Sequence, residues 1–341
     1  MLELPIQRSR PDPELAAALS LSAVTRDPFS FRVEPSRDGT AELRGVTRDV
    51  VGAFEQIFGA TLDTFGSDPL SRVLSPGRSD VAETHFEIDV DPPGSVVELL
   101  GVLLPGLLRR DYPTELVLTG CTHVSGAYLP EQVEPALVPI VEAMGGGLDI
   151  ELDAYGFRPR GPGQLRATVT PIQGRVQPLD LRDRGYVRHV ELSILLAHLP
   201  QHVGLREIDA FADNMTADVS LGATLTELHD AASQGNVVLI EVEGSECPEV
   251  LTVMGEEGVP AEEIGRRGLS EFASYLAGRG QLRDTTRWAL ALAVMAGEGR
   301  IWSSQLGEFS KAICKFAPEL ADTHVVIKGE DTETVKLQVT R

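Results

Sequence analysis

The first residues that could do chemistry are two arginines, Arg8 and Arg10, in a short polar segment between an apolar lead-in and a helix. Asp12 is a good N-cap and Pro13 suits the first helical position, so a helix is predicted to begin there. Loops that enter a helix often bind phosphate, because free N–H groups and the helix dipole point at the ligand. This loop has no glycine. Any anion would therefore be held by the two guanidinium groups, unless the loop is simply solvated.

A second group of basic residues, Arg158, Arg160 and Arg166, follows a turn and partly alternates along the chain. Such a strip could bind phosphate, although an exposed strand edge would have the same pattern. No spacing of His, Cys, Asp or Glu indicates a metal site. The three cysteines are scattered through the sequence, so they are expected to be reduced structural thiols.

The composition is that of an acidic globular protein. With 341 residues and 42% hydrophobic content, the chain can bury a large core, and about two domains are expected. Its formal net charge of -21 repels polyanions, which disfavours non-specific nucleic-acid binding, although a local arginine cleft could still bind RNA. Neither a leader nor an apolar run long enough to cross a bilayer is apparent, so an intracellular, cytoplasmic protein is expected, not a membrane protein.

Hydrophobic periodicity indicates which elements position these residues. It predicts strand, helix, strand and helix over residues 2–58, and two short strands within residues 63–91 complete a βαβαββ module. A similar order of elements follows: a very apolar helix at 96–108, a strand at 114–119, a helix at 129–144, and strands at 148–155 and 165–171. The pattern predicts a fold built from similar α/β modules.

Nine short segments occur in the order and at about the spacing of a known family: 18–22, 93–95, 120–124, 156–163, 183–185, 201–208, 235–243, 255–259 and 295–297. Among them are Gly120-Cys-Thr-His-Val124 and Gln201-His-Val-Gly-Leu-Arg-Glu-Ile208. Through these segments the sequence resembles the RNA 3'-terminal phosphate cyclase family over essentially its whole length.

The resemblance implies an α/β (α+β) architecture of three βαβαββ modules, like the C-terminal domain of translation initiation factor 3. A smaller α/β domain is inserted in the third module. The expected cyclase-like core is residues 1–187 and 279–341, and the expected insert is residues 188–278.

The resemblance also implies a reaction. Active members use ATP and a divalent metal: a histidine near the C-terminus takes AMP and passes it to an RNA 3'-phosphate, and the 2'-hydroxyl then closes a 2',3'-cyclic phosphate. The histidine begins a His-x-x-Thr-Asn segment. The corresponding stretch here, residues 301–315, contains no histidine. Loss of the nucleophile would remove the covalent step.

Other positions depart from the family pattern in the same direction. A glycine-rich family loop falls on residues 8–13. A Tyr-x-x-Asp-Gln pattern aligns with Asp284-Thr-Thr-Arg-Trp288, which places a cation and an indole where a carboxylate and an amide belong. A family tyrosine is replaced by Arg158, whereas Arg37 and Arg44 match basic positions.

The leading hypothesis is therefore a non-catalytic, cyclase-like pseudoenzyme whose cleft binds an RNA end, a nucleotide or a protein partner, with a role in RNA processing by analogy. The expected RNA- or phosphate-binding residues are Arg8, Arg10, Arg37, Arg44, His123, Arg158 and Arg160, with His123 in a loop facing the cleft. An active ATP-dependent cyclase with relocated groups and a protein-binding scaffold are the alternatives. No catalytic residue and no cofactor are expected.

If the protein were active, Lys311 or Glu308 would be the residue to test, with ATP and a divalent metal as cofactors. Lysine accepts AMP in other nucleotidyl transferases, but only where its pKa is strongly depressed, and a solvated helix lysine is the alternative. The sequence predicts no oligomeric state.

Overall fold

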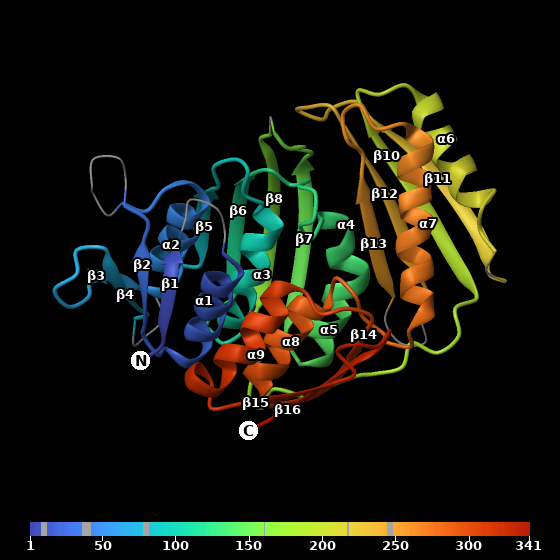
Figure 1. The fold of residues 1–341 in the computed structure, drawn as a ribbon. Helices are drawn as coiled ribbons and strands as arrows, with labels where there is room; N and C mark the ends of the chain where they lie inside the picture. The colour runs from blue at the N-terminus through green and yellow to red at the C-terminus, as the bar shows by residue number, and fades with distance from the viewer. Residues whose placement is uncertain (8–11, 36–41, 78–81, 160, 217, 244–247) are drawn as a thin grey trace.

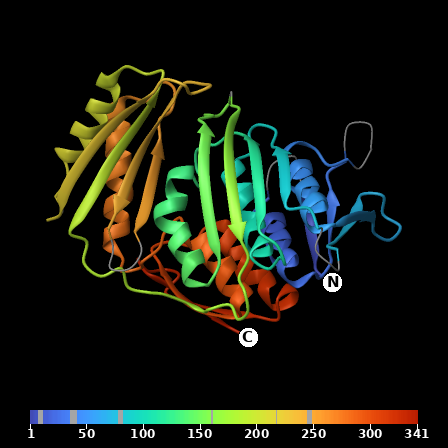
Figure 2. The same cartoon turned by 180° about the vertical axis from the view of Figure 1, so that it is seen from behind.

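The structure is a computed structural model that describes residues 1–7, 12–35, 42–77, 82–159, 161–216, 218–243 and 248–341. Within these residues the chain forms four mixed sheets of four strands each, with helices packed against them (Figure 1). Seen from behind, the strands of the second sheet face the viewer (Figure 2). The predicted mixed α/β fold class is confirmed.

The first sheet is built by β1 (Glu3–Gln7), α1 (Pro13–Thr25), β2 (Phe29–Val33), α2 (Gly45–Phe58), β3 (Thr61–Thr64) and β4 (Ser71–Ser75). Its strand order is β1-β2-β4-β3, and only the β1–β2 pair is parallel. Helix α1 begins as predicted, because the Asp12 carboxylate accepts the backbone N–H of Glu14 at 2.8 Å and Pro13 occupies the first turn.

The second sheet repeats this arrangement. Its elements are β5 (His85–Asp89), α3 (Val96–Leu107), β6 (Thr114–Gly120), a helical segment of α4 (Pro130–Gln132), η1 (Val133–Leu137, a π-helical turn) and α5 (Val138–Ala143), then β7 (Gly147–Ala154) and β8 (Gly163–Thr170). The order is β5-β6-β8-β7, again with one parallel pair, β5–β6.

One predicted module boundary is wrong. Residues 63–91 were expected to hold the last two strands of the first module, but β5 pairs with β6 and so begins the second sheet. The missed feature is a turn at residues 65–70, where Gly66 adopts a φ of 66° that favours glycine. The turn makes a hairpin of β3 and β4, which completes the first sheet before residue 76.

The third sheet has the same order and one parallel pair: β9 (Leu179–Leu181), β14 (Glu298–Ser303), β16 (Val335–Thr340) and β15 (His324–Lys328). Helices α8 (Thr286–Ala296) and α9 (Glu308–Leu320) belong to it. Between β9 and α8 the chain forms the fourth sheet and its helices: β10 (His189–Ala197), α6 (Gln201–Ala212), β11 (Ser220–Leu228), β12 (Gly235–Val242), β13 (Glu249–Met254) and α7 (Ala261–Ala277). We propose residues 188–278 as the bounds of this inserted unit.

The inserted unit has its own core, in which Phe211 of α6 and Phe272 of α7 pack on one face of its sheet. The other face packs on the second module, where Leu195 and Val237 meet Leu129 and Phe157. We call this contact the seam. Strand β12 is apolar on both faces because both are covered.

Two chain segments connect the inserted unit to the rest, and Arg184 joins them. Its guanidinium donates to the carbonyls of Gly278 at 2.6 Å and Leu276 at 3.0 Å, and it lies over the Tyr275 ring. Nearby, Asp183 pairs with Arg279 at 2.8 Å. These contacts fix the inserted unit at its root. No helix in the described part of the chain is both long and apolar enough to span a membrane.

Candidate functional site

A cavity of about 500 Å³ opens where five helices begin. Its lining includes Pro13 of α1, Val46 of α2, Ser95 before α3, Arg287 of α8 and Glu308 of α9, each within two residues of a helix start. In β-α-β crossovers, a helix begins at the carboxyl end of the preceding strand, so helices of neighbouring modules can start at one place. Free N–H groups and helix dipoles make such a place favourable for an anion.

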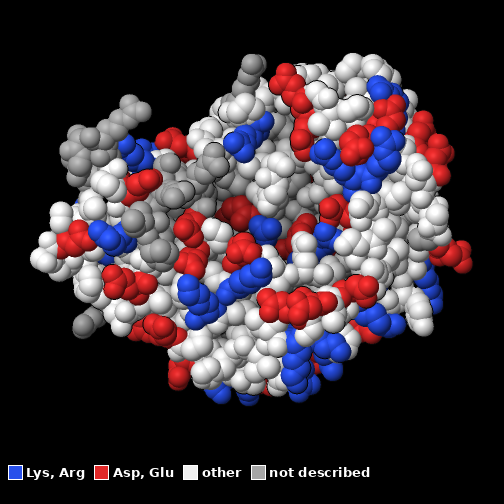
Figure 3. Space-filling model, in the orientation of Figure 1, with Lys and Arg blue, Asp and Glu red and all other residues white. Residues whose placement is uncertain are grey.

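The face of the molecule that Figure 3 shows is hollowed at its centre, and positively and negatively charged side chains surround the hollow. Among the described lining residues, four are acidic, namely Asp12, Glu98, Asp284 and Glu308, and three are basic, namely Arg158, Arg283 and Arg287. Val50, Leu99 and Val102 add an apolar wall from α2 and α3. The cavity therefore has no strong charge of one sign, and its specificity depends on how these charges are paired.

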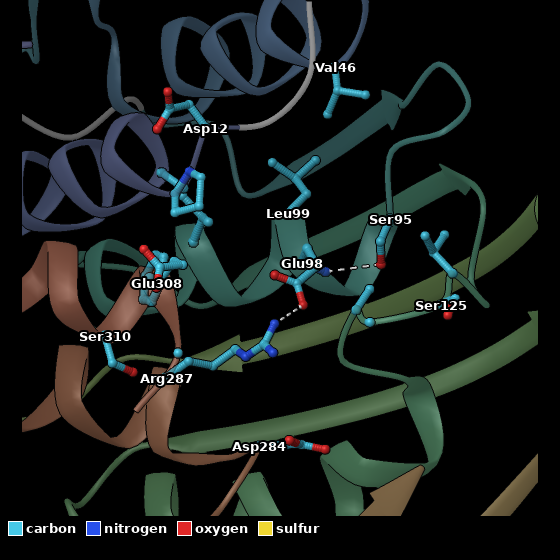
Figure 4. Close-up of a pocket in the computed structure, with 18 of the residues that line it drawn as sticks. Asp12, Val46, Ser95, Glu98, Leu99, Ser125, Asp284, Arg287, Glu308 and Ser310 are labelled. Atoms are coloured by element: carbon cyan, nitrogen blue, oxygen red, sulfur yellow. Dashed lines mark hydrogen bonds and ion pairs between the residues drawn. The ribbon is translucent and has the colours of Figure 1, made fainter. Parts of the chain in front are cut away.

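One ion pair crosses the cavity wall from α3 to α8 (Figure 4). Glu98 Oε1 accepts from Arg287 Nη1 at 2.6 Å and from the backbone N–H of Tyr128 at 2.7 Å. The side chains of Arg287 and Glu98 are 25% and 32% exposed, so they are only partly screened by water. The pair holds the Arg287 guanidinium at the cavity in a fixed position.

Helix α8 is also held from the seam. Glu249 of β13 is fully buried, and it accepts the backbone N–H of Arg283 at 2.8 Å and the Thr285 hydroxyl at 2.9 Å. Burial, together with the charge of Asp284, raises the pKa of Glu249 to about 8. The Thr285 hydroxyl also meets the Tyr128 hydroxyl at 2.8 Å. A carboxyl group of the inserted unit thus positions the turn that brings Arg283 and Asp284 to the cavity.

Two of the residues proposed from the sequence line this cavity, Arg158 and Glu308. Arg158 follows β7 and is exposed, and it has no ion-pair partner in the described part of the chain. Glu308 pairs with Lys311 at 3.0 Å. Lys311 itself is not among the lining residues, and the hydrogen bond that its ammonium donates to Glu308 raises the pKa of Lys311 above the usual value.

His123 lies in the interior and not on the cleft surface that the sequence predicts. Its side chain is fully buried and stacks on Phe157, with ring centroids 4.6 Å apart. Its Nε2 is 3.1 Å from a Glu131 carboxylate oxygen, and its Nδ1 is 2.8 Å from the Thr122 hydroxyl. The reason is tertiary: the loop after β6 is covered by the segment after β7, which a stretch of sequence cannot reveal.

None of the other arginines proposed from the sequence is among the described residues that line the cavity. Arg44 is the N-cap residue of α2, next to the cavity wall in sequence but outside its lining. Arg8, Arg10, Arg37 and Arg160 lie outside the described residues. Their proposed part in binding stays a prediction.

Comparison with known proteins identifies the relatives of this chain. A family model described as RNA 3'-terminal phosphate cyclase matches residues 14–327. The chain belongs to this family. A protein of Koribacter versatilis named RNA 3'-terminal phosphate cyclase is 33% identical over 264 residues, which cover 77% of this chain and 73% of the relative. Proteins of the same name from Ralstonia nicotianae and Ectopseudomonas mendocina are 29% and 27% identical, and each alignment covers 95% of this chain and 93% or 94% of the relative.

The divalent metal that the family resemblance implies does not fit the described side chains of the cleft. Each lining carboxylate already has a partner: Asp12 caps α1, Glu98 binds Arg287, Asp284 accepts from Gln305 at 3.1 Å, and Glu308 binds Lys311. Among the described residues, no group of three or more His, Cys, Asp or Glu side chains is placed to hold a metal ion. The carboxylates of the cleft serve as partners of cations and N–H groups.

Sequence reasoning missed Glu98 and Glu249, the two carboxylates that position α8. A signal for Glu98 was present, since it is the one charged residue on the very apolar helix α3. A lone carboxylate in the first turn of an otherwise buried helix often has a specific partner. Glu249 carries no such signal, because it follows a polar stretch and its partners are 34 and 36 residues away.

Proposed function

We propose that this protein binds the 3'-phosphate end of RNA in the cleft without the family's covalent adenylyl step. The observation that supports it best is the cavity itself, where five helix starts meet the guanidinium groups of Arg158 and Arg287 and no histidine is among the described lining residues. Guanidinium groups and helix N-termini recognise phosphate through charge and directed N–H donors. With a net charge of -21, RNA binding would be confined to such a local site.

The absence of a suitable nucleophile supports the non-catalytic part of the proposal. Residues 301–315, which correspond to the family segment that carries the histidine, contain none. Lys311 is a poor substitute because its ion pair with Glu308 raises its pKa and keeps the amine protonated. A lysine nucleophile needs the opposite shift. We extend the proposal, from the family alone, to a role in RNA processing in the cytoplasm, with protein partners left open.

The covalent step is tested directly by incubating the protein with α-labelled ATP and Mg²⁺ and separating it under denaturing conditions. We expect no labelled protein, whereas an active member of the family gives a labelled band in parallel. A band from this protein would overturn the non-catalytic proposal and favour an ATP-dependent cyclase, with Lys311 as the first residue to map.

RNA-end binding is tested by fluorescence anisotropy with two short RNAs that differ only in a 3'-phosphate or a 3'-hydroxyl. We expect the 3'-phosphate to bind at least about tenfold more tightly, as expected for charge-assisted hydrogen bonds to the terminal phosphate. Equal affinity for the two RNAs would contradict end recognition and favour the scaffold alternative.

A further inference from the structure

Two neighbouring side chains of α8 each have a matching partner on α3. Arg287 and Trp288 are the residues at which the family resemblance implies a carboxylate and an amide. Across the helix contact, Arg287 meets Glu98 and Trp288 meets Gly101. On α8 the guanidinium of Arg287 has a carboxylate partner on α3, and the indole of Trp288 packs against a glycine of α3.

The space for Trp288 exists because residue 101 is glycine. A Cβ atom at Gly101 would lie 2.5 Å from the Trp288 ring, which is closer than real contacts allow. The indole is 1% exposed and meets the rings of Phe309 and Tyr128 edge-on, at centroid distances of 5.1 and 6.3 Å. The Arg287 guanidinium carbon lies 5.9 Å from the centroid of this buried ring, so the indole borders the guanidinium on one side.

Arg287 faces the cavity with spare donors. In Figure 4 its guanidinium points toward Glu98, to which Nη1 donates. In the described part of the chain, its other N–H groups have no hydrogen-bond partner. Since a guanidinium has five N–H donors in a planar fork, Arg287 can bind Glu98 and a phosphate oxygen at once. Arg158 lines the same cavity from the loop after β7 and supplies a second cation.

We infer that Arg287 and Arg158 bind the terminal phosphate of the ligand directly, with no bridging divalent metal, and that Glu98 weakens this binding. The inference rests on the proposed function of the cleft. A carboxylate at position 287 would attract a cation, whereas a guanidinium there attracts the anion itself. Among the described residues no group of three or more His, Cys, Asp or Glu side chains is placed to hold a metal, and Glu98 and Asp284 already accept from Arg287 and Gln305. Glu98 places a negative charge beside the incoming phosphate and shares the Arg287 donors.

The test measures binding of the 3'-phosphate RNA by anisotropy, once with Mg²⁺ and once with EDTA at matched ionic strength. We expect affinities that agree within about twofold, because charge screening is equal in the two buffers. Arg287→Ala and Arg158→Ala should each weaken binding by about tenfold or more, as the loss of a charge-assisted phosphate contact predicts. Arg300→Ala, which removes an exposed arginine on β14 outside the cavity, is the matched control and should leave affinity unchanged.

Glu98→Gln tests whether the Glu98 carboxylate repels the phosphate of the ligand. The change removes this negative charge and keeps the shape of the side chain, so RNA binding should tighten about fivefold. Arg287→Lys keeps the positive charge but not the fork, and it should bind more weakly than wild type even where its unfolding midpoint matches. If the Arg287→Ala protein does not fold, the Arg287→Lys protein still measures the contribution of the guanidinium to RNA binding.

The two proposals fail in different ways. If the wild type binds neither RNA, or binds both equally, the proposed function fails. If it prefers the 3'-phosphate only when Mg²⁺ is present, or if a folded Arg287 variant binds like wild type, the direct contact is overturned while the proposed function stands. Looser binding by Glu98→Gln would also contradict the assigned role of Glu98.

Discussion

The cleft and the seam meet at one short segment, residues 283–287. The two regions differ in how far their polar groups are buried. On the seam side, Glu249 is fully buried and its oxygens accept from Arg283 and Thr285. On the cleft side, Arg287 and Glu98 are partly exposed, and Arg158 is open to solvent. This difference in burial predicts which substitutions should change the stability of the fold and which should change ligand binding. Buried polar groups leave an unsatisfied partner when one member is removed, whereas exposed groups are compensated by water.

The seam contains further buried polar groups with hydrogen-bond partners. Ser233 Oγ accepts the backbone N–H of Phe157 at 3.1 Å and donates to the Phe157 carbonyl at 2.9 Å. Gln132 donates to the carbonyl of Val250 at 2.6 Å. Because these bonds surround an apolar cluster, the seam resembles the interior of a domain more than a mobile interface.

The largest effect is expected from Glu249→Ala. The change removes the carboxylate that accepts the backbone N–H groups of Arg283 and Thr285 and the Thr285 hydroxyl, so the free energy of unfolding should fall by about 3 kcal/mol. Urea unfolding followed by circular dichroism measures it. Glu249→Gln keeps an acceptor oxygen and should cost clearly less. A Glu249→Ala protein as stable as wild type would show that the seam does not hold α8.

The stability of the protein should depend on pH through two buried carboxyl groups. Burial raises the pKa of Glu207, a carboxyl inside the inserted unit, to about 7, and that of Glu249 to about 8. Since both folded pKa values lie above the unfolded value of 4.5, the stability from these groups is complete below that pH. It is lost as the pH rises through about 7 and 8.

The loss is measured as the urea midpoint between about pH 5 and pH 9, and each unit of raised pKa corresponds to about 1.4 kcal/mol at most. The double variant Glu207→Gln, Glu249→Gln should show a much flatter profile. An unchanged profile in the double variant would assign the pH dependence to other groups.

Gly101→Ala lies at the border of the two regions and should have an intermediate effect. The added Cβ would clash with the buried Trp288 ring, so we expect destabilisation of about 1 to 2 kcal/mol after the gain in helix propensity is allowed for. Gly52→Ala is the matched control, because Gly52 is also inside a helix and a Cβ there would meet nothing within 4 Å. The control should be neutral or stabilising. Similar destabilisation in both variants would contradict the close fit at Trp288.

The smallest effect is expected from Lys311→Ala. Lys311 is 47% exposed and its partner Glu308 is 74% exposed, so water replaces the ion pair readily. The unfolding midpoint should not change measurably, and neither should 3'-phosphate RNA binding. A clear loss of RNA affinity would move the binding site toward the exposed face of α9 and break the contrast drawn between the cleft and the seam.

Several features of this protein were predictable because they depend on local pattern. The alternation and helical spacing of apolar residues predicted the order of strands and helices over residues 2–58 and 96–171, and Asp12 and Pro13 predicted the start of α1. The prediction failed at residues 63–91, because a polar turn with one glycine is a weak signal and each residue of β5 pairs with a residue 30 positions further along the chain. Arg158 and Glu308 were found from family positions, but their presence in one cavity was not visible in the sequence.

The acidic composition, the mixed α/β fold class, the family and the lack of a histidine in residues 301–315 can be read from the sequence. Only the tertiary structure decided which charges face the cleft. Glu98 and Arg287 are 189 residues apart in the chain and 2.6 Å apart in space, and His123 is enclosed by segments that follow it. The physical reason is that backbone pattern is a local property, whereas the pairing of charges depends on which distant segments pack together and exclude water.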